Sequence, residues 1–200
     1  MSSTSKWTRA AVATVAALLV TGCGTAAPGA AAIVGSERIS ERDLTQKVEQ
    51  VLRAQGRPVD SASEALVVTT LDRLITTSLV EQFAQQEGVG VTQGELDATI
   101  AGYVESIGGQ QAFDAALLQQ DITPESIPDL FRVNLLAQKL GLALEPMGSP
   151  EAQSTAVVIA VAEFSEEVGT SVSPRYGTWD PMNVSIAAIP NDLSIPGRLS

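Results

Sequence analysis

Side chains able to carry out catalysis are few in this 200-residue sequence, which contains no histidine and one cysteine, Cys23. The absence of histidine excludes an imidazole base, as in Ser-His-Asp and Cys-His arrangements, and removes the commonest zinc ligand. A lone cysteine supports neither an intramolecular disulfide nor a cysteine-cluster metal site. We therefore expect no catalytic residue, no bound metal and no cofactor. Any catalysis would have to use carboxylates, Lys, Ser or Tyr.

Two pairs of residues have spacings that occur in hydrolytic enzymes. Glu163 and Glu167 lie four positions apart and would share one face of a helix, where paired carboxylates can act as in glycosidases. The alternative, which we favour, is a solvent-exposed helix face with mild repulsion between like charges. Ser3 and Lys6 have the spacing of a Ser-Lys dyad but lie in an amino-terminal secretion signal. Neither pair therefore predicts an enzyme.

The chain is acidic, with 12 Lys and Arg against 23 Asp and Glu and a formal net charge of −11. A surface of this charge repels nucleic acid before specific contacts form, so we expect no nucleic-acid partner. Apolar residues make up 44% of the chain and aromatic residues only 4%. This composition supports one core built mostly from Ala, Leu, Val and Ile.

The amino terminus has the parts of a bacterial secretion signal. Lys6 and Arg9 supply the positive region, and residues 10–20 (AAVATVAALLV) form an apolar run of 11 residues. That run is far shorter than the roughly 20 residues with which a helix spans a bilayer. Residues 19–23 (LVTGC) follow directly and resemble the lipobox of bacterial lipoproteins, with the single cysteine at the required place.

The lipobox resemblance implies cleavage between Gly22 and Cys23, a diacylglycerol group on the Cys23 thiol and acylation of the new amine. Two or three acyl chains make a stable anchor, since each buried methylene adds roughly 0.8 kcal/mol. We thus expect a signal peptide at 1–22, a lipidated flexible tether at 23–31 and an extracytoplasmic protein anchored to the outer face of the cell membrane. An uncleaved signal anchor and a free catalytic Cys23 are the alternatives.

The mature chain is predicted to be mainly α-helical. Apolar residues recur every four positions over the longest predicted helix, for example at Leu71, Ile75 and Leu79, which is typical of a core-facing helix. Residues 156–162 (AVVIAVA) fit a helix or a buried strand, and their Glu- and Gln-rich flanks favour a helix. Helices are expected at about 40–55, 62–87, 93–108, 110–120, 123–144 or 126–144, and 150–168, and short strands at 31–34, 37–39, 171–173 and 184–189.

The predicted strands lie near the two ends of the mature chain. Gly35 and Ser36 can form a type II′ turn between the first two strands, with Gly at the first central position. We expect one helical domain over 32–190, with a small β element joining its amino- and carboxyl-terminal ends. A disordered tail at 191–200 is expected to follow.

Residues 173–181 (SPRYGTWDP) form the most distinctive stretch, because two of the few aromatic residues and an Arg lie among turn-forming residues. In one interpretation, Arg175, Tyr176 and Trp179 form an exposed surface that binds a peptide or protein partner. In the other, which we favour for the local structure, Tyr176 and Trp179 close an edge of the core and Arg175 pairs with a carboxylate. These three residues are the sequence's only candidates for partner binding.

Three segments follow one another in an order that is typical of a known family. Residues 32–44 (AIVGSERISERDL) approach the pattern Ala-x-Val-Asn-Gly-Glu-x-Ile-Thr, with Gly-Ser in place of Asn-Gly. Residues 130–144 fit a Leu-rich helix, and residues 173–179 (SPRYGTW) fit an Asn-Pro-Arg-Tyr-Gly segment that returns to the amino-terminal strand. Together they resemble bacterial extracytoplasmic foldases of the SurA and PrsA type. The resemblance implies a helical chaperone domain, like those of the SurA amino terminus and the trigger-factor carboxyl terminus.

The chain departs from the prolyl isomerases of this family, which carry a parvulin domain between the helical part and the returning strand. Only residues 145–170 occupy that place, and the parvulin site relies on histidines that this chain lacks. The resemblance thus implies a chaperone module without isomerase activity, which offers an apolar helical surface to unfolded chains. It assigns no individual binding residue.

We therefore expect a membrane-anchored chaperone-like lipoprotein that binds unfolded or partly folded secreted polypeptides and is not an enzyme. The alternative is a scaffold lipoprotein that binds one dedicated folded envelope partner, and a third hypothesis is a prolyl isomerase. Binding of many unrelated unfolded chains would favour the first. Saturable binding of one folded protein through Tyr176 and Trp179 would favour the second.

Overall fold

The computed structural model describes residues 28–188. The predicted signal peptide, Cys23 and the predicted tail at 191–200 lie outside the described residues. The described chain is mainly helical, as predicted, and its strands form two small sheets. In chain order the elements are β1 (Ala30–Val34), β2 (Glu37–Ser40), α1 (Glu41–Ala54), α2 (Glu64–Gln86), α3 (Gln93–Ile107), α4 (Gln110–Leu118), the 3₁₀ turn η1 (Pro124–Ser126), α5 (Ile127–Leu144), α6 (Pro150–Glu167), β3 (Ser171–Val172), β4 (Thr178–Asp180) and β5 (Ser185–Ala187).

Four of the helices begin at a hydroxyl side chain that caps the first turn. The hydroxyl of Thr92 accepts a hydrogen bond from the Glu95 amide at 3.3 Å, and the Glu95 carboxylate accepts one from the Thr92 amide at 2.8 Å. This is the capping box that satisfies two amides left unpaired at a helix start. Ser40, Ser63 and Ser149 cap α1, α2 and α6 in the same way with one bond each.

The start of α5 combines both predicted starting points. Residues 124–126 form a 3₁₀ turn that begins after Thr123, and the α-helix proper begins at Ile127 after Ser126. Neither hydroxyl caps the first turn. The Thr123 and Ser126 hydroxyls instead lie 3.1 Å apart and form a hydrogen bond with each other, and Pro124 and Pro128 have no amide to cap.

Two sequence predictions about strands are corrected by the structure. Ala30 and Ala31 belong to β1 and are buried, so the tether predicted for 23–31 does not extend over these two residues. Within the described residues, the strand predicted at 184–189 spans β5, and its partner β4 lies where turn-forming residues were expected. β4 forms because Trp179 pairs with Ile186 in an antiparallel hairpin. The turn begins only after Asp180, the last residue of β4.

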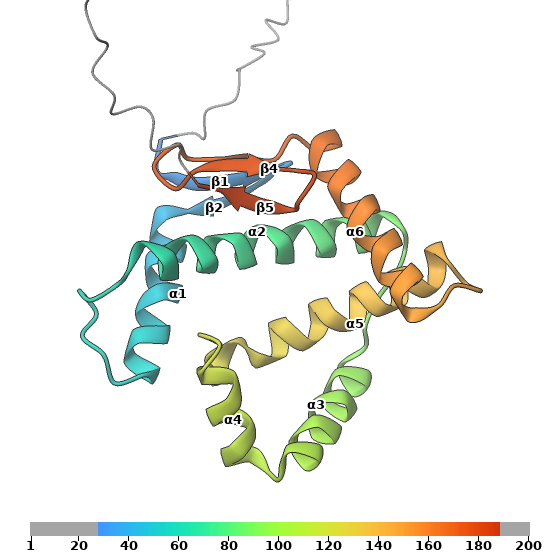
Figure 1. Cartoon of the computed structure of the whole chain (residues 1–200), viewed down its shortest axis with the longest axis horizontal. Coiled ribbons are helices and arrows are strands. Elements are labelled where there is room, and N and C mark those ends of the chain that lie inside the picture. The colour runs from blue at the N-terminus through green and yellow to red at the C-terminus, as the bar shows by residue number, and fades with distance from the viewer. Residues whose placement is uncertain (1–27, 189–200) are drawn as a thin grey trace, which may run out of the picture.

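The β element joins the two ends of the domain, as predicted. β1 lies between β2 and β3, and both pairings are antiparallel. Ala32 is opposite Val172, and the Ser173 amide donates to the Ala31 carbonyl at 2.8 Å. Both sheets lie on one side of α2, and α3, α4 and α5 lie on the other side (Figure 1).

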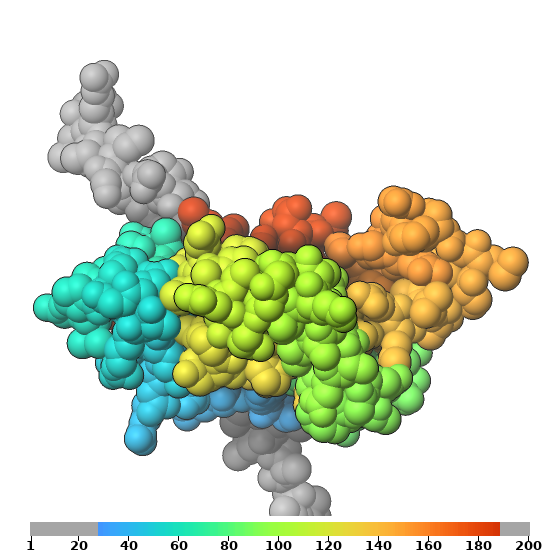
Figure 2. Space-filling model, turned by 90° about the horizontal axis from the view of Figure 1, so that it is seen from below, coloured from blue at the N-terminus to red at the C-terminus, as the bar shows by residue number. Residues whose placement is uncertain are grey.

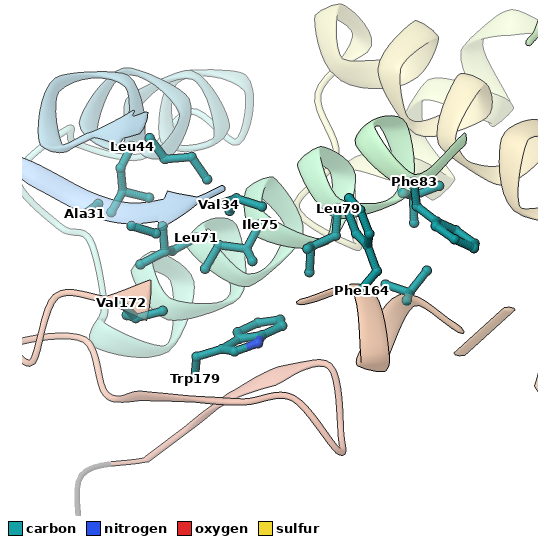
Figure 3. Packing of buried hydrophobic residues seen from close by; sticks show 14 of the residues in the cluster. Ala31, Val34, Leu44, Leu71, Ile75, Leu79, Phe83, Phe164, Val172 and Trp179 are labelled. Atoms are coloured by element: carbon teal, nitrogen blue, oxygen red, sulfur yellow. The ribbon is translucent and has the colours of Figure 1, made fainter. Parts of the chain in front are cut away.

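The apolar side chains form two separate clusters. The larger one surrounds α2, whose Leu71, Ile75 and Leu79 are fully buried, as the four-residue spacing predicted. Figure 3 shows these side chains in line along α2, with Val172 and the Trp179 indole below them. The smaller cluster joins α3, α4, the segment after α4 and α5 through Leu96, Phe113, Ile122, Ile127 and Phe131.

Gly177 allows the β4–β5 hairpin to close. Its φ is 133°, and a Cβ added there would lie 2.3 Å from the Ala187 carbonyl oxygen and 2.7 Å from Ile186 Cγ2. Gly88, after α2, also has a positive φ (67°), but a Cβ there would meet nothing within 4 Å. Of these two glycines, only Gly177 combines backbone strain with a steric conflict.

This pair predicts different costs for the same substitution. Gly88→Ala should lower the free energy of unfolding by about 1 kcal/mol, the cost of a left-handed backbone for an alanine. Gly177→Ala should cost at least about 3 kcal/mol, because strain adds to the clash with β5. Urea denaturation followed by circular dichroism measures both values, and equal losses would contradict the steric argument.

Candidate functional site

A groove of about 980 Å³ lies on the helical side of α2. In Figure 2 the α3–α4 pair (green) and α6 (orange) project, and the surface is set back between them. The residues that line the groove come from five helices, the segment after α4 and the turn between β4 and β5. They are Thr76, Val80, Thr99, Tyr103, Ile107, Phe113, Leu117, Gln120, Ile122, Leu130, Phe131, Val133, Asn134, Leu135, Ala137, Gln138, Gly141, Leu142, Pro150, Gln153, Ser154, Val157, Val158, Val161, Asn183 and Val184.

None of these lining residues is charged, although 18% of the chain is Asp, Glu, Lys or Arg. The polar lining side chains are amides and hydroxyls, which can donate to and accept from a peptide backbone. Four large lining side chains are also unusually exposed for their type, namely Tyr103, Ile107, Leu142 and Val158. Exposed apolar surface among neutral polar groups is typical of a surface that binds a partner.

One wall of the groove is held by the smaller apolar cluster. The Phe131 ring of α5 packs edge-on against the Tyr103 ring of α3 at 5.0 Å and against the Phe113 ring of α4 at 5.8 Å. Tyr103 is half exposed, whereas Phe113 and Phe131 are buried. The buried rings therefore fix the position at which Tyr103 faces the groove.

The opposite wall is held by close packing of α5 and α6. A Cβ added at Gly141 would lie 3.0 Å from Gln153 Cβ, so the glycine allows α6 to approach the backbone of α5. The Gln153 amide donates to the Glu145 carbonyl at 3.1 Å and to the Gly148 carbonyl at 3.3 Å. These contacts set the angle at which α6 leaves the end of α5.

A polar clamp ties the α3–α4 wall to the larger cluster. The Arg73 guanidinium donates to the carbonyls of Asp121 and Gln120 at 3.0 and 3.1 Å, and Gln55 Nε2 donates to Asp121 Oδ1 at 2.7 Å. Asp121 has a φ of 58°, which few residues other than Gly adopt. The clamp over-determines this strained backbone and so fixes the chain between α4 and α5.

A second, smaller pocket of about 400 Å³ is lined by the clamp residues Arg73 and Asp121 and by other charged side chains, including Lys47, Asp72 and Asp129. The Asp72 carboxylate accepts a hydrogen bond from the Ile186 amide at 2.8 Å and so attaches β5 to α2. Burial raises the pKa of Asp72, and the Ile186 bond lowers it by less. Asp72 holds β5 and Arg73 holds the chain after α4, so the charged residues of this pocket have a structural role.

The three residues predicted to bind a partner lie away from the groove, at the edge of the core. Trp179 is buried, and its Nε1 donates to the Ser165 hydroxyl at 3.2 Å. The Tyr176 hydroxyl donates to Glu41, which also lies 3.5 Å from Arg175 Nη1. Burial and the Glu41 carboxylate raise the pKa of Tyr176 to about 12.

This geometry matches the core-edge interpretation of residues 173–181, and partner binding by Arg175, Tyr176 and Trp179 stays a prediction. Glu163 and Glu167 are exposed on α6, in agreement with a solvated face. Among residues 28–188 no group of three or more His, Cys, Asp or Glu side chains is placed to hold a metal ion. Within the same part of the chain, no helix has the length and apolar character needed to cross a membrane.

The groove was not predicted from the sequence. One available signal was the uncharged run 152–162, where apolar residues such as Val158 and Ile159 occur on the side of the helix that does not face the core. A helix that is apolar on more than its core-facing side needs a second partner. The other lining residues are brought together only by the packing of five helices.

Comparison with known proteins agrees with this architecture. The sequence profile of the SurA-like N-terminal domain matches residues 2–141, and the chain belongs to this family. Membership of this family indicates a chaperone-type module, and the described structure is mainly helical. No curated protein and no solved structure gave a match.

Asp72 provides a pH test of the contact between α2 and β5. Since burial raises the pKa of Asp72 above its ordinary 3.8, the native chain holds this proton more tightly than the unfolded chain. Stability should therefore fall as the pH rises from about 4 through the raised pKa, and then stay level. Asp72→Asn keeps an oxygen for the Ile186 amide and should remove this slope in urea denaturation between about pH 4 and pH 7.

The matched control is Asp72→Ala, which leaves the Ile186 amide without its acceptor. That variant should be less stable than Asp72→Asn at every pH in the range. A pH profile of Asp72→Asn that runs parallel to that of the native chain would contradict the assignment.

Proposed function

We propose that this protein is an extracytoplasmic, chaperone-like lipoprotein whose groove binds extended apolar segments of unfolded secreted polypeptides, without prolyl isomerase activity. The observation that carries the proposal is the uncharged groove on a member of the SurA-like N-terminal domain family. An apolar segment that enters it displaces water from exposed Tyr, Ile, Leu and Val side chains and meets no charge that must lose its hydration.

The energetics favour moderate and exchangeable binding. Buried apolar surface contributes roughly 25 cal/mol per Å², and ordering a flexible peptide consumes much of that gain. Micromolar affinity corresponds to about −8 kcal/mol. The amide side chains Gln120, Asn134, Gln138 and Gln153 line the groove and offer hydrogen bonds to any peptide backbone, which favours tolerance of many sequences.

The lipid anchor belongs to the same proposal. Cys23 precedes Ala30, the first residue of β1, by seven positions, a span of at most about 25 Å. Most residues that line the groove belong to helices on the side of α2 away from the sheets (Figure 1). An anchor at Cys23 would therefore hold the sheets near the membrane and direct most of the groove away from it. This orientation suits capture of chains that emerge into the extracytoplasmic space.

Two double variants test the groove without disturbing the core. Leu142→Gln with Val158→Gln changes two exposed groove residues. Ile159→Gln with Val59→Gln changes two equally exposed residues outside it, and Val158 and Ile159 are 50% and 53% exposed on the same helix. Fluorescence anisotropy with a permanently unfolded polypeptide should show about tenfold weaker binding for the first variant only.

The outcomes separate the proposal from its alternatives. Competition by unrelated unfolded chains, but not by folded proteins, supports a general chaperone. Equal weakening by both variants, or no binding by the native chain, would refute the groove as the binding site. Saturable binding of a single folded envelope protein would favour the scaffold instead.

The anchor is tested by Cys23→Ser in the full chain. The native protein should fractionate with membranes of a bacterial host and incorporate radiolabelled palmitate, since two or three acyl chains bind a bilayer stably. Cys23→Ser should lose both properties, and Ser5→Ala or Thr21→Ala serves as a control in the same segment. Membrane attachment that persists without Cys23 would contradict lipidation.

A further inference from the structure

Three of the five helices that line the groove carry charge of one sign only. α3, α4 and α6 contain eight Asp and Glu residues and no Lys or Arg: Glu95, Asp97, Glu105, Asp114, Glu151, Glu163, Glu166 and Glu167. The stretch from Arg38 to Arg73, over β2, α1 and the first half of α2, contains six basic and six acidic residues, so its charges cancel. The molecule is therefore electrically asymmetric, and its groove is bordered by the acidic part.

The two basic residues of α5 do not offset this asymmetry at the groove. Lys139 forms an ion pair with Glu95 at 2.6 Å and donates to the Gly90 carbonyl at 2.8 Å. Together with Thr92, Lys139 lowers the pKa of Glu95 to about 2, so the pair stays ionised. Arg132 lies close enough to Glu81 of α2 to lower the pKa of that carboxyl, against the larger effect of burial.

We propose that the groove selects apolar polypeptide segments that are flanked by Lys or Arg, and that it disfavours segments flanked by Asp or Glu. This inference rests on the proposed function, and it adds which class of polypeptide segment the groove binds best. The uncharged lining takes the apolar centre, and flanking cations that leave the groove at either wall meet carboxylates. Electrostatic attraction between exposed charges extends about 8 Å at physiological salt, so the carboxylates attract only those flanking residues that lie close to the walls.

Three peptides with one apolar centre and different flanks test this selection on the purified protein. The centre is Leu-Val-Phe-Leu-Val, and the flanks are two Lys, two Gln or two Glu on each side. At low salt the affinity should fall in the order Lys, Gln, Glu, with about tenfold between the first and the last. At high salt the difference should shrink to about twofold or less, because salt screens exposed charges.

A fourth peptide, with Lys flanks and a Ser-rich centre, separates apolar binding from attraction by net charge alone. It should bind at least about tenfold more weakly than the Lys-flanked apolar peptide. Equal affinity of these two peptides would overturn the proposal.

Matched variants locate the effect at the walls. Asp114→Asn with Glu151→Gln neutralises two carboxylates directly beside the lining residues Phe113 and Pro150. Asp60→Asn with Glu64→Gln removes the same charge at the α1–α2 connection, and Glu64 stands in the first turn of α2 as Glu151 does in α6. Only the first variant should reduce the preference for Lys flanks, by about threefold.

The results distinguish this inference from the function on which it rests. If none of the apolar peptides binds, the proposed function fails. If all three bind equally at low salt, the function stands and the selection is refuted. If both double variants lose the preference equally, net charge is the cause, and the acidic walls are not a selective site.

Discussion

Burial of α2 on both of its sides is the constraint on which the rest of the structure depends. Leu71, Ile75 and Leu79 of α2 face the sheets and the β3–β4 segment. Helices α5 and α6 pack against other faces of α2. A helix that is apolar around most of its circumference is stable only inside other elements. The β4–β5 sheet has too few strands to be stable alone, and the three-stranded sheet contains the two-residue strand β3, so both sheets depend on the apolar side of α2 that they cover.

The second constraint acts on α5, which divides its apolar residues between two clusters. Leu136 and Leu140 pack in the larger cluster, and Ile127 and Phe131 pack in the smaller one. Helix α5 therefore supports both walls of the groove, and the side chains of neither wall fill the space between them. The groove is what remains when α3–α4 and α6 each pack on α5 without packing on each other.

Local signals made most of the fold predictable. The hydroxyl caps at Ser40 and Thr92 and the four-residue spacing along α2 gave helix positions to within about two residues. The β4 strand could not be predicted, because three residues that include a single aromatic become a strand only when Ile186 pairs with them. The groove was unpredictable for a similar reason: residues as distant in sequence as Val80, Tyr103 and Val158 meet only after five helices have packed.

The acidic charge also opposes the self-association that an open apolar groove favours. Exposed Leu142, Val158 and Tyr103 would favour burial against a second copy of the chain. The carboxylates of α3, α4 and α6 are present on both copies, so two grooves repel each other as they approach. A partner without negative charge meets no such barrier. Under the proposed function, the same carboxylates that oppose pairing of two grooves would also select the polypeptides that reach the groove, which links the charge asymmetry of the fold to the proposed selectivity.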